Sequence, residues 1–270
     1  NTLVINDVEI QIEDMTQAHI TTLEKIYPIS GFDTNNPEKV SPKVNDIKVK
    51  QNVKVLVPIF PGTVGEYDLV HKFQNLGAQV NSFVYQGDNE AFALAIEASD
   101  VIAFADGSIN GDVPQISGFA LQVLNQEVVK TAIEKHLENN KRILGFGNGF
   151  QLLVKSGLIP YEKVQESKLS FAKNNTGRPI NLEVNVQESK HDSFWLNNIE
   201  TRTLYHAQTY GQLVGDVKDL KVAFYYDGRN PNGSKNAIEG LISNKGNVFG
   251  RMTSVSEDIL KNAMSDITHE

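Results

Sequence analysis

The chain of 270 residues contains no cysteine. This absence excludes thiolate catalysis, disulfide bonds and zinc–thiolate sites. The six histidines are scattered, with no His-x-His or His-x-x-x-His pair, so we expect no metal site. The lack of disulfides fits a reducing cytoplasm, which is where we expect this protein to work.

Long apolar runs and a basic surplus are missing as well. No apolar run approaches the length that crosses a bilayer, and no signal peptide is visible, so we expect no membrane partner. A formal net charge of −8 argues against nucleic acid or an anionic membrane as partner. With 40% hydrophobic and 21% charged residues, the composition is that of an ordinary globular protein.

The chain divides near residue 50. Residues 3–12 alternate apolar and polar around an Asn-Asp pair, which predicts a small hairpin, and residues 14–25 have the apolar spacing of a short helix. Residues 28–52 are rich in Pro, Asn and Lys with little apolar periodicity, which predicts a surface linker. We therefore expect a hairpin, helix and linker segment over residues 1–50 and a single larger domain over residues 51–270.

The larger domain has the pattern of an α/β fold. From residue 53 onward, apolar strands alternate with amphipathic helices, which is typical of a parallel sheet covered on both faces. The pattern predicts a mostly parallel central sheet, with one long helix over residues 118–137 and a last helix over 257–264. Between them, from about residue 168, it changes to short β-like runs.

The most informative motif is a glycine-rich turn at residues 142–151, Arg-Ile-Leu-Gly-Phe-Gly-Asn-Gly-Phe-Gln, between an apolar strand and a helix. Such a turn is typical of a nucleophile elbow, which holds one residue in strained backbone geometry with small neighbours. Gly147 stands where the nucleophile would be, and it has no side chain. Glycine adopts that geometry without steric cost. The sequence thus predicts the elbow of a covalent-catalysis enzyme without its reactive atom.

Four segments in the same order resemble the class I glutamine amidotransferase domain of phosphoribosylformylglycinamidine (FGAM) synthase. They are the elbow at residues 145–151, the Phe-Pro-Gly-Thr turn within 55–68, the Asp-Gly-Ser-Ile-Asn-Gly-Asp segment at 106–112, and Asn-Pro-Asn-Gly-Ser within 230–238. The resemblance implies a flavodoxin-like α/β fold and a place in purine biosynthesis. It also implies a family chemistry in which Cys attacks the glutamine amide, His relays protons and N–H groups hold the oxyanion.

The same resemblance implies that the catalytic positions have changed in this chain. The family's nucleophilic Cys corresponds to Gly147, and its base and orienting acid align with Ser254 and Ser256. In the oxyanion turn Asp106 replaces the first glycine, while Gly107 remains. The other positions of the former oxyanion and substrate pocket are Asn148, Gln151 and His206.

Each of these residues also has a purely structural interpretation. One of Ser254 and Ser256 is expected to cap the last helix, because acidic residues follow at its start. The segment from Asp106 is expected to be a turn, and His206 to be a hydrogen-bonded structural histidine. No catalysis is needed to explain these residues.

The resemblance therefore implies a degenerate glutaminase domain, the C-terminal part of an FGAM-synthase-like protein. It is expected to dock to and stabilise the synthase body, in the same or a partner polypeptide, without hydrolysing glutamine. ATP and Mg²⁺ would belong to that body, and this chain is expected to hold no cofactor. Two alternatives stay open. One is a ligand-binding or regulatory module that reuses the glutamine pocket, and the other is an amidotransferase-fold enzyme with a different nucleophile, served by His206 and Asp106.

Overall fold

The computed structural model describes residues 1–23, 26, 34–35, 41, 44–45, 48–105 and 117–265. The strands are β1 Thr2–Ile5, β2 Val8–Gln11, β3 Thr34–Asn35, β4 Lys54–Ile59, β5 Gln79–Val84, β6 Val101–Phe104, β7 Arg142–Phe146, β8 Leu169–Ala172, β9 Ile180–Glu188, β10 Thr203–Gln208, β11 Gln212–Gly215, β12 Lys221–Arg229, β13 Ile238–Ile242 and β14 Val248–Arg251. The helices are α1 Ile12–Thr21, α2 Glu66–Asn75, α3 Asn89–Glu97, α4 Ser117–Leu124, α5 Glu127–Glu138, α6 Asn148–Lys155, α7 Leu158–Tyr161 and α8 Glu257–Ala263, with 3₁₀ turns at Phe194–Leu196 and Lys235–Ala237.

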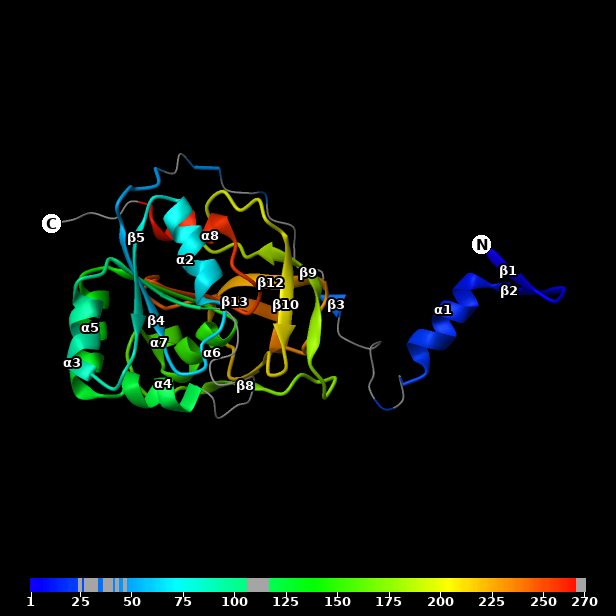
Figure 1. Ribbon diagram of the computed structural model, residues 1–270, viewed down its shortest axis with the longest axis horizontal. Coiled ribbons are helices and arrows are strands. Elements are labelled where there is room, and N and C mark those ends of the chain that lie inside the picture. Colours follow the sequence, from blue (N-terminus) through cyan, green and yellow to red (C-terminus); the bar gives the residue numbers. More distant parts are fainter. Residues whose placement is uncertain are drawn as a thin grey trace.

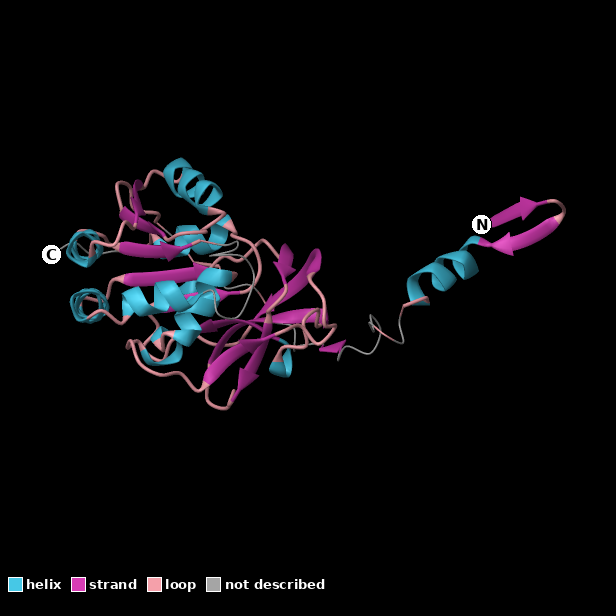
Figure 2. Ribbon diagram, turned by 60° about the horizontal axis from the view of Figure 1, so that its bottom comes forward, coloured by secondary structure: helices cyan, strands magenta, loops and turns pink. Residues whose placement is uncertain are grey.

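A central sheet with helices on both faces forms the body of the molecule (Figures 1 and 2). Its strands run in the order β10-β9-β12-β13-β14-β7-β6-β4-β5, and β3 pairs with β12 beside this path. The five strands from β14 to β5 pair in parallel, whereas β10, β9, β12 and β13 pair antiparallel. The predicted α/β class is confirmed, and the antiparallel strands make the complete sheet mixed.

The sheet separates two apolar layers, because successive side chains of a strand point to opposite faces. In β7, Ile143 packs with the layer that includes α3 to α6, whereas Leu144 packs with the layer under α2 and α8. The strand is therefore an unbroken run of buried residues, as expected for a parallel strand covered on both sides. Trp195 is fully buried in the second layer.

The single long helix expected over residues 118–137 is wrong, because the structure has α4 and α5 with a break between them. Gln126 has extended backbone angles (φ −65°, ψ 132°) and precedes α5. The Asn125 side-chain amide donates to the Leu121 carbonyl, and the Gln126 amide donates to the Gln122 carbonyl. The Leu121 carbonyl also accepts from the Asn125 backbone N–H, so Asn125 and Gln126 close the last turn of α4 with both backbone and side-chain bonds. The apolar periodicity continues through the break, so it gave no sign of the turn.

The first 23 residues form a hairpin and a helix that lie apart from the body in both views (Figures 1 and 2). Asn6 and Asp7 both have positive φ, 47° and 62°, as a two-residue type I′ hairpin turn requires. Further on, the chain lies against the body: Val49 bridges to Ser265, and the Asn52 N–H donates to the Gly77 carbonyl. The described part of the predicted linker therefore follows the body's surface.

Candidate functional site

The elbow lies at the carboxyl end of β7, where α6 begins. Gly147 has φ 50° and ψ −114°, a conformation that side chains with a Cβ rarely adopt. Its N–H donates to the Arg251 carbonyl at 2.9 Å, and its own carbonyl accepts from the Gln151 N–H at 3.0 Å. The backbone is therefore fixed on both sides in the conformation of a nucleophile elbow, which would strain a residue with a Cβ, yet it presents no side chain.

The neighbouring glycines let α6 approach the sheet closely. A Cβ at Gly145 would lie 2.7 Å from the Gly149 carbonyl carbon, and a Cβ at Gly149 would lie 2.5 Å from the Phe104 carbonyl oxygen. Both positions therefore require glycine for packing, independently of any chemistry. Asn148 is buried beside them, and its Oδ1 has no hydrogen-bond partner among the described residues.

Of the other predicted catalytic positions, Ser254 has a structural role in its contact with Tyr205. The Ser254 N–H donates to the Tyr205 carbonyl at 2.9 Å, and its Oγ accepts from the Tyr205 N–H at 3.3 Å. Ser256 occupies the position before α8, but its side chain makes no capping bond there. The expected helix-capping serine is thus present at the right place without the expected hydrogen bond. Asp106 and Gly107 lie outside the described residues.

Gln151 connects the elbow helix to the turn between β10 and β11. Its side-chain amide donates to the Tyr210 carbonyl at 2.9 Å and to Gln208 Oε1 at 3.4 Å. Asn174 holds the same turn, donating to the Gln208 carbonyl and accepting from the Gly211 N–H. The structure therefore brings the elbow, the His206 segment and β14 together at one edge of the sheet.

His206 lies inside this edge and not on its surface. It is fully buried, and its Nδ1 lies 3.3 Å from the Tyr226 hydroxyl. Burial lowers the pKa of His206 to about 4, although the nearby Glu239 carboxylate opposes that shift. Its Nε2 has no hydrogen-bond partner within the described part of the chain. At neutral pH the imidazole is therefore uncharged, and its described hydrogen bond is with the Tyr226 hydroxyl.

Asn232 connects Tyr226, the hydrogen-bond partner of His206, to the turn between β10 and β11. Its amide donates to the Tyr226 hydroxyl at 3.1 Å and to the Gly211 carbonyl at 2.7 Å. Burial and the Glu239 carboxylate raise the pKa of Tyr226 well above its usual value, so the hydroxyl stays protonated. The Asn-Pro-Asn-Gly-Ser segment is thus hydrogen-bonded to the turn between β10 and β11.

Two neighbouring strands of the sheet, β13 and β14, carry a buried ion pair close to the elbow. Arg251 and Glu239 are both fully buried, with 3.2 Å between Arg251 Nη2 and Glu239 Oε2. Thr253 donates to Glu239 Oε1 from both its N–H and its hydroxyl, at 2.9 and 2.7 Å. The Arg251 guanidinium also lies 4.3 Å from the centre of the Phe224 ring. Since the Arg251 carbonyl accepts from Gly147, this pair supports the strand on which the elbow rests.

Sequence reasoning did not single out Glu239 or Arg251. The available signal was one acid and one base, each in an otherwise apolar strand of adjacent segments. Buried charges occur in pairs, because an unpaired charge is costly away from water. Only the three-dimensional register, in which Gly240 pairs with Arg251, shows that the two side chains meet.

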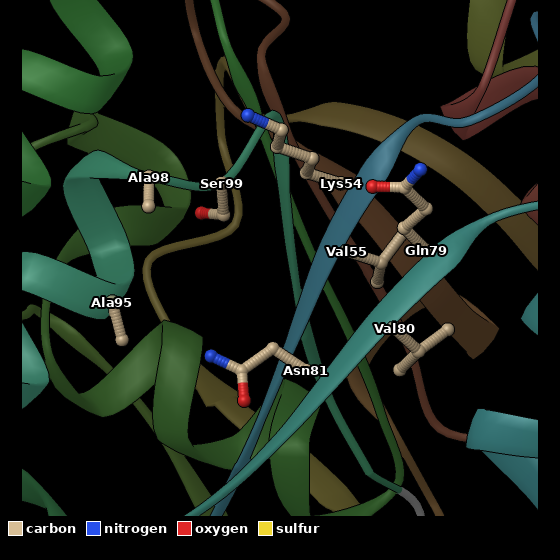
Figure 3. Close-up of a pocket in the computed structure, with 8 residues that line it drawn as sticks. All are labelled: Lys54, Val55, Gln79, Val80, Asn81, Ala95, Ala98 and Ser99. Carbon is tan, nitrogen blue, oxygen red and sulfur yellow. The ribbon is translucent and has the colours of Figure 1, made fainter.

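A separate hollow of about 310 Å³ lies between β4, β5 and α3 (Figure 3). Lys54, Gln79, Asn81 and Ser99 surround it with their polar side chains, together with alanines of the α3 end. Lys54 and Gln79 are the first residues of their strands, so the hollow opens near the amino ends of the parallel strands. Ligands of open α/β sheets bind at the opposite, carboxyl ends. The elbow remains the candidate site.

Neither metal-binding clusters nor membrane spans are found in the described part of the chain. No group of three His, Cys, Asp or Glu side chains there could hold a metal ion. The described helices all fall short of the length and apolarity that a membrane span requires.

Comparison with known proteins agrees with this geometry. Residues 52–270 match the family model of the CobB/CobQ-like glutamine amidotransferase domain. The phosphoribosylformylglycinamidine synthase subunit PurQ of Sulfurimonas denitrificans is 30% identical over 210 residues, which cover 74% of this chain and 88% of that protein.

Solved structures give the same result. The structure of PurLQS from Thermotoga maritima contains a chain that is 25% identical, with a TM-score of 0.62, and the match covers 78% of this chain and 96% of that one. A protein from Thermoplasma acidophilum, described as a GMP synthase subunit, is 14% identical with a TM-score of 0.53, and the match covers 80% of this chain and 94% of that one. At that identity the second likeness shows the fold alone.

Proposed function

The chain belongs to the family of glutamine amidotransferase domains that includes the glutaminase subunit of FGAM synthase, and we propose that it is a degenerate member, unable to hydrolyse glutamine. In this proposal its role in purine biosynthesis is to dock to the synthase body and stabilise it. The body then uses free ammonia as its nitrogen source.

One observation carries the proposal. Gly147 retains the positive-φ backbone of the elbow, and no thiol exists anywhere in the chain. Removing a catalytic nucleophile leaves only the modest rate that binding and the oxyanion site supply. A fold preserved around an empty catalytic position is expected where selection acts on assembly.

The alternative with a different nucleophile has little support from the geometry. His206 is fully buried and has a pKa of about 4, because burial disfavours its charged form. A general base must lie within hydrogen-bond reach of the group that it deprotonates. The described neighbour of its Nδ1 is the Tyr226 hydroxyl, which burial keeps protonated. The second candidate function is a ligand-binding module. It would require a ligand that binds in the former glutamine pocket.

The partner in this proposal is an FGAM synthase body. The similar Sulfurimonas denitrificans protein is named as a subunit of that synthase, and the similar Thermotoga maritima chain comes from the structure of PurLQS. ATP and Mg²⁺ would bind to that body, and this chain would carry no cofactor. Work in the cytoplasm follows from the same proposal.

The test is ammonia release from glutamine by the purified chain, with an active PurQ-type glutaminase as positive control. We expect no release above background. The variant Gly147→Cys is expected to stay inactive, since Ser254 and Ser256 offer no imidazole and an unperturbed thiol, with a pKa of about 8.5, is only a few per cent ionised at neutral pH. Glutamine turnover by the wild-type chain, at a rate near that of the control, would refute the proposal.

A further inference from the structure

The N-terminal hairpin has one apolar face. Cross-strand partners of an antiparallel pair lie on the same face, and successive residues alternate. The register pairs Leu3 with Ile10 and Ile5 with Val8, which places four apolar side chains on one face. The pairs on the other face are Thr2 with Gln11 and Val4 with Glu9.

Leu3, Ile5 and Val8 of this face are exposed and Ile10 is half-buried, and the first turn of α1 carries further exposed apolar side chains. Ile5 is 52% exposed and Val8 is 58% exposed. At the start of α1, Ile12 and Met15, three residues apart and so on neighbouring positions of one helix side, are 45% and 43% exposed. A two-stranded hairpin is marginally stable alone, and contiguous exposed apolar surface marks an interaction site. The element needs a cover that the described body does not supply.

The charge of this element indicates which kind of surface would pack against its apolar face. The first 23 residues contain Asp7, Glu9, Glu13 and Asp14 but no Lys or Arg. The rest of the chain is also net acidic, so electrostatics disfavour docking to this body or to a second copy. The complementary surface has an apolar floor and a rim of Lys and Arg.

The hairpin and helix also lie outside the matched family region, residues 52–270. They are an addition to a domain that already has its own two apolar layers. We propose that residues 1–23 are the docking element of this chain, whose apolar face packs into a basic-rimmed apolar groove of the FGAM synthase body. This inference rests on the proposed function and names the part of the chain that performs it.

Two valines provide a matched test. Val4 and Val8 are each 58% exposed and lie on opposite faces of the hairpin. The experiment measures the affinity of the full chain for the synthase of the same organism, purified without this chain. We expect Val8→Asn to weaken binding by about tenfold or more, since a buried valine is lost from the interface, and Val4→Asn to weaken it by less than about threefold. Rising ionic strength should weaken binding of the wild-type chain as well.

A second measurement does not depend on how the variants fold. Hydrogen exchange of backbone amides in residues 2–11 should slow when the synthase is added to the wild-type chain. Equal affinity of the two variants, with unchanged exchange in these residues, would overturn the inference and leave the proposed function standing.

The remaining outcomes also decide the matter. If the wild-type chain does not bind the synthase at all, the proposed docking function and this inference both fail. Slow exchange in residues 2–11 of the isolated monomer would show that the body itself is the cover. Self-association of the wild-type chain that Val8→Asn abolishes would show that a second copy is the cover. Each of these two results would overturn the inference.

Discussion

Buried polar side chains near the elbow contact one another in pairs. His206 faces Tyr226, and Glu239 is paired with Arg251, at positions without access to water. Buried polar groups cost free energy unless they are bonded, and a buried ion pair is weak evidence for stability in itself. Their contribution here is positional, since the strand that carries Arg251 accepts the hydrogen bond from Gly147.

Two histidines give the protein a predictable sensitivity to acid. Burial lowers the pKa of both His136 and His206 from 6.5 to about 4. Between these values the unfolded chain binds protons that the folded chain does not, so the free energy of unfolding falls as the pH drops below 6.5. At pH 5 the loss is roughly 2 kcal/mol for each histidine relative to pH 7.5.

The check is urea unfolding at pH 7.5 and pH 5 for the wild-type chain, His136→Gln and His206→Gln. Each variant should reduce the difference in unfolding free energy between the two pH values by roughly 2 kcal/mol. A wild-type difference that neither variant changes would show that these imidazoles are not buried as described.

The elbow element is the part of the site that the sequence predicts best. A glycine pattern specifies backbone geometry locally, and Gly147 indeed has the positive φ that the pattern requires. The apolar strand expected before the turn is present as β7. Apolar periodicity missed the break at Asn125 and Gln126, where the Gln126 backbone is extended although the apolar spacing continues. It also missed the Glu239–Arg251 pair, because the register between two strands cannot be derived from the sequence of either strand alone.

A glycine comparison tests the close approach of α6 to the sheet. A Cβ at Gly149 would lie 2.5 Å from the Phe104 carbonyl oxygen, whereas a Cβ at Gly118 in α4 meets nothing within 4 Å. We expect Gly149→Ala to lower the free energy of unfolding by about 1–3 kcal/mol, despite the better helix propensity of alanine.

Gly118→Ala is the matched control, because it makes the same replacement in a helix with open space around it. It should leave stability unchanged or raise it by at most about 1 kcal/mol. The measurement is thermal or urea unfolding of both variants. Equal stability of the two would mean that α6 does not lie as close to β6 as described.

At the scale of the whole molecule, the chain combines an α/β body with an N-terminal element that lies apart from it (Figure 2). The sequence predicted the hairpin and the helix of this element, since turn chemistry and apolar spacing are local. It did not predict that the apolar face of the hairpin would be uncovered, because coverage depends on contacts between distant segments. The elbow without a side chain and the exposed acidic hairpin are the two observations on which the proposed role in assembly rests.

The proposed role in assembly without glutamine hydrolysis is tested most directly by determining which compound supplies the transferred nitrogen. The synthase and this chain, assembled together, are supplied with glutamine labelled with ¹⁵N in its amide and with unlabelled ammonium, and the mass of the amidine product is determined. We expect unlabelled product, formed at a rate that depends on ammonium and not on glutamine. Replacing the chain with an active PurQ-type glutaminase serves as the control for label transfer. Product that carries ¹⁵N from glutamine with this cysteine-free chain in place would contradict the account.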